Sequence, residues 1–133
     1  MTRDARLGAG RLAMLTTQAW LGLLAFDVAR LAGFARLCAW LHRRRPASRR
    51  HAATVEDLVW SVDEACVWYV KRAACLQRSA VATWLLRRQG VAAEMVIGCR
   101  PLPFESHAWV EVDGRVVNDL PQYQRAFTVL DRL

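Results

Sequence analysis

Residues 75–90 read Cys75-Leu-Gln-Arg-Ser-Ala-Val-Ala-Thr-Trp-Leu-Leu-Arg-Arg-Gln-Gly90, and residues 107–119 read His107-Ala-Trp-Val-Glu-Val-Asp-Gly-Arg-Val-Val-Asn-Asp119. In the first run, apolar residues at positions 76, 80, 81, 84 and 85 have the spacing of one buried helix face, and Gly90 is a natural C-terminal stop. Cys75 therefore begins the predicted helix, where unpaired backbone N–H groups and the helix macrodipole stabilise a thiolate. Together the two runs supply a thiol, an imidazole and a carboxylate, the side chains that a cysteine hydrolase uses.

The second run belongs to a predicted β-hairpin. Residues 93–98 and 107–112 read as strands, with Pro101 and Pro103 breaking the chain between them. Asp113-Gly114 then gives a strong turn signal. We attribute Asp113 to this turn and not to catalysis.

The register of the turn decides whether His107 and Asp119 meet. A two-residue turn would pair His107 with Leu120 and leave Asp119 on the opposite face of the sheet. A three-residue loop with a G1 bulge would pair His107 with Asp119, and Glu111 with Arg115. We favour the second register because it sets opposite charges across from each other. That pairing would also account for Glu111, which we do not assign to catalysis.

The combined pattern resembles the transglutaminase-like leader peptidase of lasso-peptide biosynthesis. The matching pieces are the cysteine helix, the strand after it, His107-Ala-Trp-Val-Glu111 and Gly114-Arg-Val-Val-Asn-Asp119, and they cover about residues 55–133. The resemblance implies an α+β fold whose core is that of a transglutaminase-like, papain-like cysteine protease. It also implies that Cys75, His107 and Asp119 form a catalytic triad.

The same resemblance implies a substrate and partners. Members of that family remove the leader from a ribosomally made precursor peptide, which frees the core peptide for a separate ATP-dependent cyclase. Some are fused to a small leader-recognition domain and others rely on a separate protein for it. About 50 residues precede the catalytic region here and read as helix, so we expect the stand-alone form with a separate leader-recognition protein. Two alternatives stay open: a transglutaminase-like acyl transferase, and a non-catalytic scaffold that holds a partner through residues 11–51.

The other cysteines and histidines do not suggest a metal site. There is no Cys-x-x-Cys and no histidine pair at helical spacing, and the intervals between cysteines do not resemble a zinc framework. We interpret Cys38, Cys66 and Cys99 as core residues. His42 and His51 flank an arginine-rich segment and are interpreted as solvated. We expect neither a metal nor another cofactor.

Residues 11–42 are predicted to form a helix or a helical pair that Gly33 bends or divides. Apolar residues follow one stripe, yet much of the remaining surface is apolar too. The longest uncharged run, residues 12–26, has 15 residues, fewer than the roughly 20 that span a bilayer. We rank packing on the catalytic region first, a protein-partner surface second and an interfacial membrane helix third.

Length, composition and charge indicate the domain organisation, the location and the kinds of partner. A chain of 133 residues with 54% apolar content suits one compact domain, divided into an N-terminal helical region with a basic linker (1–51) and the peptidase region (52–133). Without a cleavable signal sequence, we expect a cytoplasmic protein with reduced cysteines. The net charge of +7 is concentrated in residues 43–51 and at Arg87-Arg88, and no nucleic-acid fold signature accompanies it. The linker is either solubilising or a docking site for an acidic partner.

A further helix is predicted to begin at Thr54, which can cap it, with Asp57 three residues on as in a capping box. Trp68 and Tyr69 lie shortly before Cys75. Aromatic side chains at such spacing are more often core, but these two could instead line a substrate groove.

Overall fold

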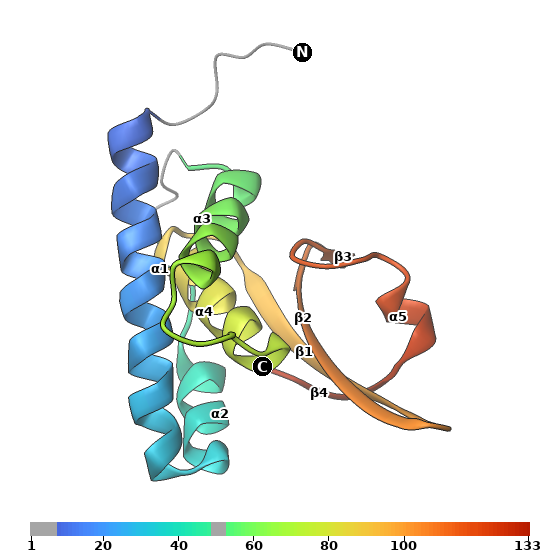
Figure 1. Cartoon of the computed structure of the whole chain (residues 1–133). Coiled ribbons are helices and arrows are strands. Elements are labelled where there is room, and N and C mark those ends of the chain that lie inside the picture. The colour runs from blue at the N-terminus through green and yellow to red at the C-terminus, as the bar shows by residue number, and fades with distance from the viewer. Residues whose placement is uncertain (1–7, 49–52) are drawn as a thin grey trace.

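The computed structural model describes residues 8–48 and 53–133. Its elements in chain order are α1 (Ala9–Ala29), η2 (Arg30–Ala32), α2 (Phe34–Arg43), α3 (Val55–Val67), α4 (Cys75–Arg88), β1 (Ala93–Pro101), β2 (Phe104–Val112), β3 (Arg115–Val116), α5 (Tyr123–Ala126) and β4 (Thr128–Arg132). The strands form one antiparallel sheet in the order β3-β2-β1-β4. Helices α1 to α4 lie to one side of it and α5 to the other (Figure 1). The α+β class is as predicted.

The N-terminal segment is divided at Gly33, as predicted. Gly33 has φ +106°, a left-handed conformation that glycine adopts without steric cost, and it separates α1 and η2 from α2. The face of α1 that packs on α3 and α4 is buried through Leu15, Ala19, Leu23 and Phe26. The first-ranked interpretation of residues 11–42, packing on the following part of the chain, is thus confirmed for α1. Judged only by length and composition, the helix Ala9–Ala32 could also cross a membrane.

Helix α3 begins at its predicted cap, and helix α4 begins and ends at the predicted signals. Thr54 Oγ1 accepts the backbone N–H of Asp57 at 3.1 Å and caps α3. Cys75 is the first residue of α4, which ends at Arg88, and Gly90 follows with φ +85°. A left-handed glycine just past the last turn is the usual C-terminal stop.

The two long strands are longer than predicted. β1 and β2 pair from Ala93 with Val112 to Pro101 with Phe104, so only two residues connect them. One face of the pair packs on the helices, and the other carries a second cluster made of Val96, Trp109 and Phe127. β4, which pairs with the other edge of β1, was not predicted from the sequence.

The register that we favoured for the hairpin is wrong. Val112 pairs with Arg115 and Glu111 with Val116, which is the two-residue turn. Asp113 and Gly114 have φ of +52° and +76°. These are the left-handed values of a type I′ turn, for which Asp-Gly is a preferred pair. The turn chemistry therefore outweighs the cross-strand attraction that we expected between Glu111 and Arg115.

Candidate active site

His107 and Asp119 meet in spite of this register. β3 ends at Val116, and the last ladder bond runs from Val117 N–H to Val110 O at 2.9 Å. The side chain of Asn118 then replaces the next backbone acceptor, because its Oδ1 accepts the Val110 N–H at 2.8 Å. The chain leaves the sheet at this point, which carries Asp119 to within 2.9 Å of His107, measured from Oδ2 to Nε2.

The His107 ring is held on several sides. Its side chain and that of Asp119 are 17% and 16% exposed. The ring centroid lies 4.5 Å from that of Tyr123, and 6.2 and 5.9 Å from those of Trp109 and Phe127. Since Nε2 faces Asp119, Nδ1 is the ring nitrogen left to exchange a proton with a thiol.

Gly98 makes room for this aromatic cluster. It lies directly across from His107 in the β1–β2 pair. A Cβ at position 98 would lie 2.8 Å from the Trp109 ring and 2.9 Å from Cβ of Phe127. Only glycine lets Trp109 and Phe127 approach the strand so closely.

Cys75 lies at a helix end suited to an anion. Its thiol is half-buried and not in a disulfide. The N-cap residue Ala74 offers no side-chain hydrogen bond, and the first turn of α4 has no acidic residue. Backbone N–H groups at this end therefore remain available to a thiolate or to an oxyanion.

The first two turns of α4 are fastened to the segment around His107. Ser79 Oγ donates to the Ala108 carbonyl at 3.1 Å and accepts from Asn118 Nδ2 at 3.1 Å. Arg78 donates from Nη2 to Asp119 Oδ2 at 3.0 Å. Consecutive helix residues thus hold the consecutive residues Asn118 and Asp119.

These contacts locate Cys75 relative to the histidine. Ser79 follows Cys75 by four residues, a rise of about 6 Å on the same helix face, and its hydrogen bond to Ala108 is beside His107. Within residues 8–48 and 53–133, no hydrogen bond joins the thiol to His107. The structure brings His107 and Asp119 together, and Arg78 and Ser79 tie α4 to Ala108, Asn118 and Asp119.

Sequence reasoning missed Arg78, Ser79 and Asn118. The first two lie three and four residues after Cys75, so they share its helix face. That spacing could have identified them as neighbours of the thiol. Asn118 gave no such signal, because its role depends on where the hairpin ladder stops.

Tyr69 is a core residue and does not line a groove. Its hydroxyl donates to Asp27 of α1, and the residue is 8% exposed. Asp27 also accepts from Lys71 at 2.8 Å and Gln77 at 3.1 Å. Trp68 is 72% exposed, so it remains available to a substrate.

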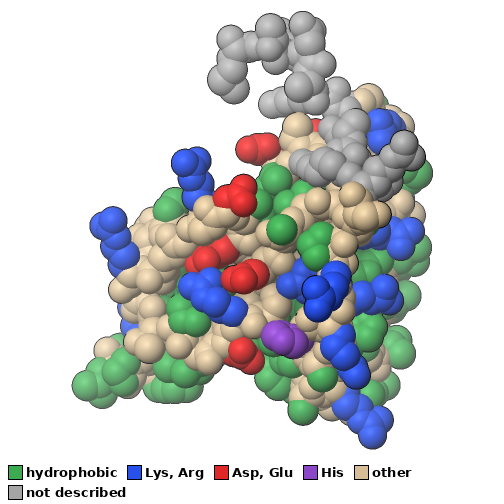
Figure 2. All heavy atoms as spheres, turned by 180° about the vertical axis from the view of Figure 1, so that it is seen from behind, with side chains coloured by type: hydrophobic (Ala, Val, Ile, Leu, Met, Phe, Trp, Pro, Cys, Tyr) green, Lys and Arg blue, Asp and Glu red, His purple; other side chains and the backbone are tan. Residues whose placement is uncertain are grey.

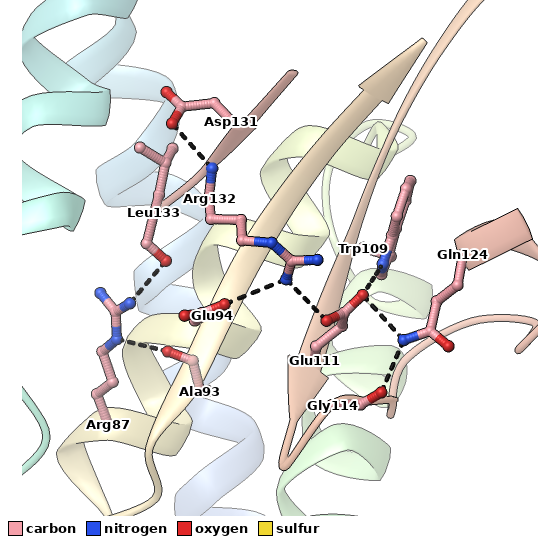
Figure 3. A network of polar contacts seen from close by, with 10 residues as sticks. All are labelled: Arg87, Ala93, Glu94, Trp109, Glu111, Gly114, Gln124, Asp131, Arg132 and Leu133. Atoms are coloured by element: carbon pink, nitrogen blue, oxygen red, sulfur yellow. Dashed lines mark hydrogen bonds and ion pairs between the residues drawn. The ribbon is translucent and has the colours of Figure 1, made fainter. Parts of the chain in front are cut away.

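Glu111 has a structural role different from the predicted one. It accepts hydrogen bonds from Trp109 at 3.0 Å, Gln124 at 3.0 Å and Arg132 at 2.9 Å (Figure 3). Burial alone would raise the pKa of Glu111, but these bonds outweigh it and the pKa lies below its usual value. The Glu111 carboxylate thus links β2, α5 and β4.

A groove of about 920 Å³ lies at the other end of α4. Arg43, Arg44 and Arg45 line one wall, and Glu94 and Glu111 lie among its other lining residues. Figure 2 shows Lys and Arg side chains along the side of the rear face that α1 and α2 form, with Asp and Glu side chains near the middle. α4 has 14 residues, about 21 Å of helix, so the groove is separate from the Cys75 end.

The remaining predicted residues play no part near His107. Cys38 and Cys66 pack against the main core, and Cys99 is half-buried in β1. His42 is exposed, and His51 lies outside the described residues. In the described part of the chain, no group of histidine, cysteine and acidic side chains is arranged to hold a metal.

Two comparisons with known proteins gave sequence matches. The sequence model of the transglutaminase-like superfamily matches residues 20–132. The microcin J25-processing protein McjB of Escherichia coli is 41% identical over 56 residues, which are 42% of this chain and 27% of that protein. The match thus spans about a quarter of the relative's length. No solved structure matches.

Proposed function

The chain belongs to the transglutaminase-like superfamily, and from this premise we propose that it is a cysteine peptidase that cuts the leader from a lasso-peptide precursor. The observation that carries the proposal is the His107–Asp119 pair at 2.9 Å, fastened by Arg78 to the helix that begins with Cys75. The similarity to a protein named for processing microcin J25 supports a peptide precursor as the substrate.

In the proposed mechanism, His107 Nδ1 takes the thiol proton and Cys75 Sγ attacks the scissile carbonyl. The backbone N–H of Cys75 donates to the oxyanion, since no side chain caps this helix end. His107 then protonates the departing amine, and water hydrolyses the thioester. Asp119 keeps the imidazole oriented through Nε2 and stabilises its protonated form.

The decisive experiment follows a candidate precursor peptide by mass spectrometry. We expect wild-type protein to yield leader and core peptides whose masses sum to the precursor plus one water. Cys75→Ala should lower the rate by about 1000-fold or more, because no other group supplies the nucleophile, while its melting temperature stays near that of the wild type. Cys99→Ala is the matched control and should cleave normally.

The same assay separates the alternatives. With a primary amine added, an acyl transferase would give a product carrying the amine in place of water. A non-catalytic scaffold would support maturation equally well with Cys75→Ala. Either result would contradict the peptidase assignment.

The exposed apolar side of α1 favours a protein partner as part of this function. Four of its large side chains are well exposed: Met14, Leu21, Leu24 and Val28. Contiguous exposed apolar side chains commonly mark interaction surfaces. We propose that a separate leader-recognition protein delivers the precursor, which raises the local concentration of the scissile bond near Cys75.

A further inference from the structure

Arg78 and His107 share one oxygen of Asp119. Arg78 Nη2 lies 3.0 Å from Asp119 Oδ2, and His107 Nε2 lies 2.9 Å from the same atom. We propose that Arg78 is a positioning residue of the catalytic centre, which fixes Asp119 against the cysteine helix and keeps a permanent positive charge beside the thiolate. This inference rests on the proposed cysteine peptidase.

Arg78 fixes the side chain of Asp119. This residue follows the end of the hairpin ladder, so no strand pairing fixes its side chain. Its Oδ1 accepts only the N–H of the next residue, Leu120, at 2.9 Å. Among the described residues, Arg78 is the one arginine or lysine that bonds Asp119. Without it, the carboxylate would turn about its side-chain torsions and His107 would lose a fixed partner.

Arg78 also places a positive charge on the helix face that carries Cys75. Arg78 follows Cys75 by three residues in α4, so the two side chains leave neighbouring points of the same helix face. A guanidinium stays protonated throughout the working pH range. It therefore keeps one positive charge on this face of α4 whatever the protonation state of His107.

Arg78 also pairs with a second carboxylate, that of Asp63. Asp63 of α3 lies 3.9 Å from Arg78 Nη1, on the side opposite Asp119. Burial raises the pKa of Asp63, and the charge of Asp119 adds to this rise while Arg78 opposes it. Cys66 of α3 also lies within the field of Asp63 and Arg78, and burial is the main cause of its raised pKa. Removing Arg78 would leave the carboxylates of Asp63 and Asp119 without the guanidinium that pairs with both.

The test compares Arg78→Met, Arg78→Lys and Asp63→Asn in the full chain. We expect Arg78→Met to lower kcat by about 10- to 100-fold with little change in KM, because the reacting groups are misplaced. We also expect the alkylation of Cys75 by iodoacetamide, followed by peptide mapping, to require a pH higher by about half a unit or more. Arg78→Lys should restore the alkylation profile but only part of kcat, since lysine keeps the charge without the planar fork.

Asp63→Asn is the matched control, because it removes the other ion pair of Arg78. This variant should have a kcat near the wild-type value, and alkylation of its Cys75 should not require a higher pH. A merely structural ion pair would lower the melting temperature in both Asp63→Asn and Arg78→Met without a shift of the alkylation profile to higher pH, and that outcome would overturn the proposal. So would full kcat in Arg78→Lys. If Arg78→Met does not fold, Arg78→Gln takes its place, judged by the same two measurements.

Failure of the peptidase assignment has a separate signature. Alkylation of Cys75 needs no substrate, so its pH profile tests Arg78 even if no peptide is cut. Cleavage that survives in Cys75→Ala would refute the peptidase alone. Cys75-dependent cleavage that is unchanged in Arg78→Met would refute the positioning role alone.

Discussion

At the scale of single residues, the two aspartates of the hairpin have separate roles. Asp119 bonds His107, whereas Asp113 occupies a left-handed turn position that asparagine also tolerates. We expect Asp119→Asn to lower kcat/KM by about 100-fold or more, because the amide cannot stabilise the imidazolium. Asp113→Asn should cleave at close to the wild-type rate. Equal losses in the two variants would contradict these roles.

A second prediction at the scale of single residues concerns Gly98. Gly98→Ala should destabilise the protein by about 1–3 kcal/mol, because the added Cβ would force Trp109 and Phe127 apart. Urea denaturation measures the change. Gly10→Ala is the matched control: among the described residues, no atom beyond its chain neighbours and the backbone of α1 lies within 4 Å of its added Cβ, so this variant should be as stable as the wild type or more so.

At the scale of elements, α1 anchors the segment that leads to Cys75. Asp27 accepts bonds from Tyr69 and Lys71 of that segment and from Gln77 of α4. Burial and the bond to Asp27 raise the pKa of Tyr69 to about 12, against about 10 in an unfolded chain. A raised tyrosine pKa stabilises the fold fully below pH 10, and this contribution is lost as the pH rises toward 12.

We therefore expect Tyr69→Phe to be less stable than the wild type at neutral pH by about 1–3 kcal/mol. The difference between the two proteins should shrink between about pH 10 and 12, as the wild-type tyrosine ionises. Chemical denaturation at a series of pH values measures this. A constant difference across that window would show that Tyr69 ionisation is not coupled to folding.

At the scale of the whole molecule, the outward side of α1 is an exposed apolar surface that the proposed catalytic centre does not use. We expect the protein alone to cleave its precursor slowly and to gain about tenfold or more with the leader-recognition protein, by raised local concentration. The double variant Leu21→Glu and Leu24→Glu should lose this gain while keeping the basal rate and fold.

Leu130→Glu is the control for this prediction, since Leu130 is also well exposed but lies in β4. This variant should keep the stimulation by the partner. Full-rate, site-selective cleavage by the purified protein without a partner would contradict the proposed delivery.

The sequence by itself determined the features that depend on neighbouring residues. The Thr54 cap, the start of α4 at Cys75, its stop before Gly90 and the division at Gly33 are all present. Each follows from local backbone preferences. His107 and Asp119 were expected to meet, and they do, but not through the register on which that expectation rested.

Only the tertiary structure decided how that pair meets. The turn follows the local preference of Asp-Gly and gives a register that should separate His107 from Asp119. Asn118 ends the ladder by replacing a backbone acceptor, and Arg78 and Ser79 hold the departing chain against α4. The contacts of Arg78 and Ser79 join residues about 40 positions apart, and no pattern of local periodicity records a hydrogen bond across such a separation.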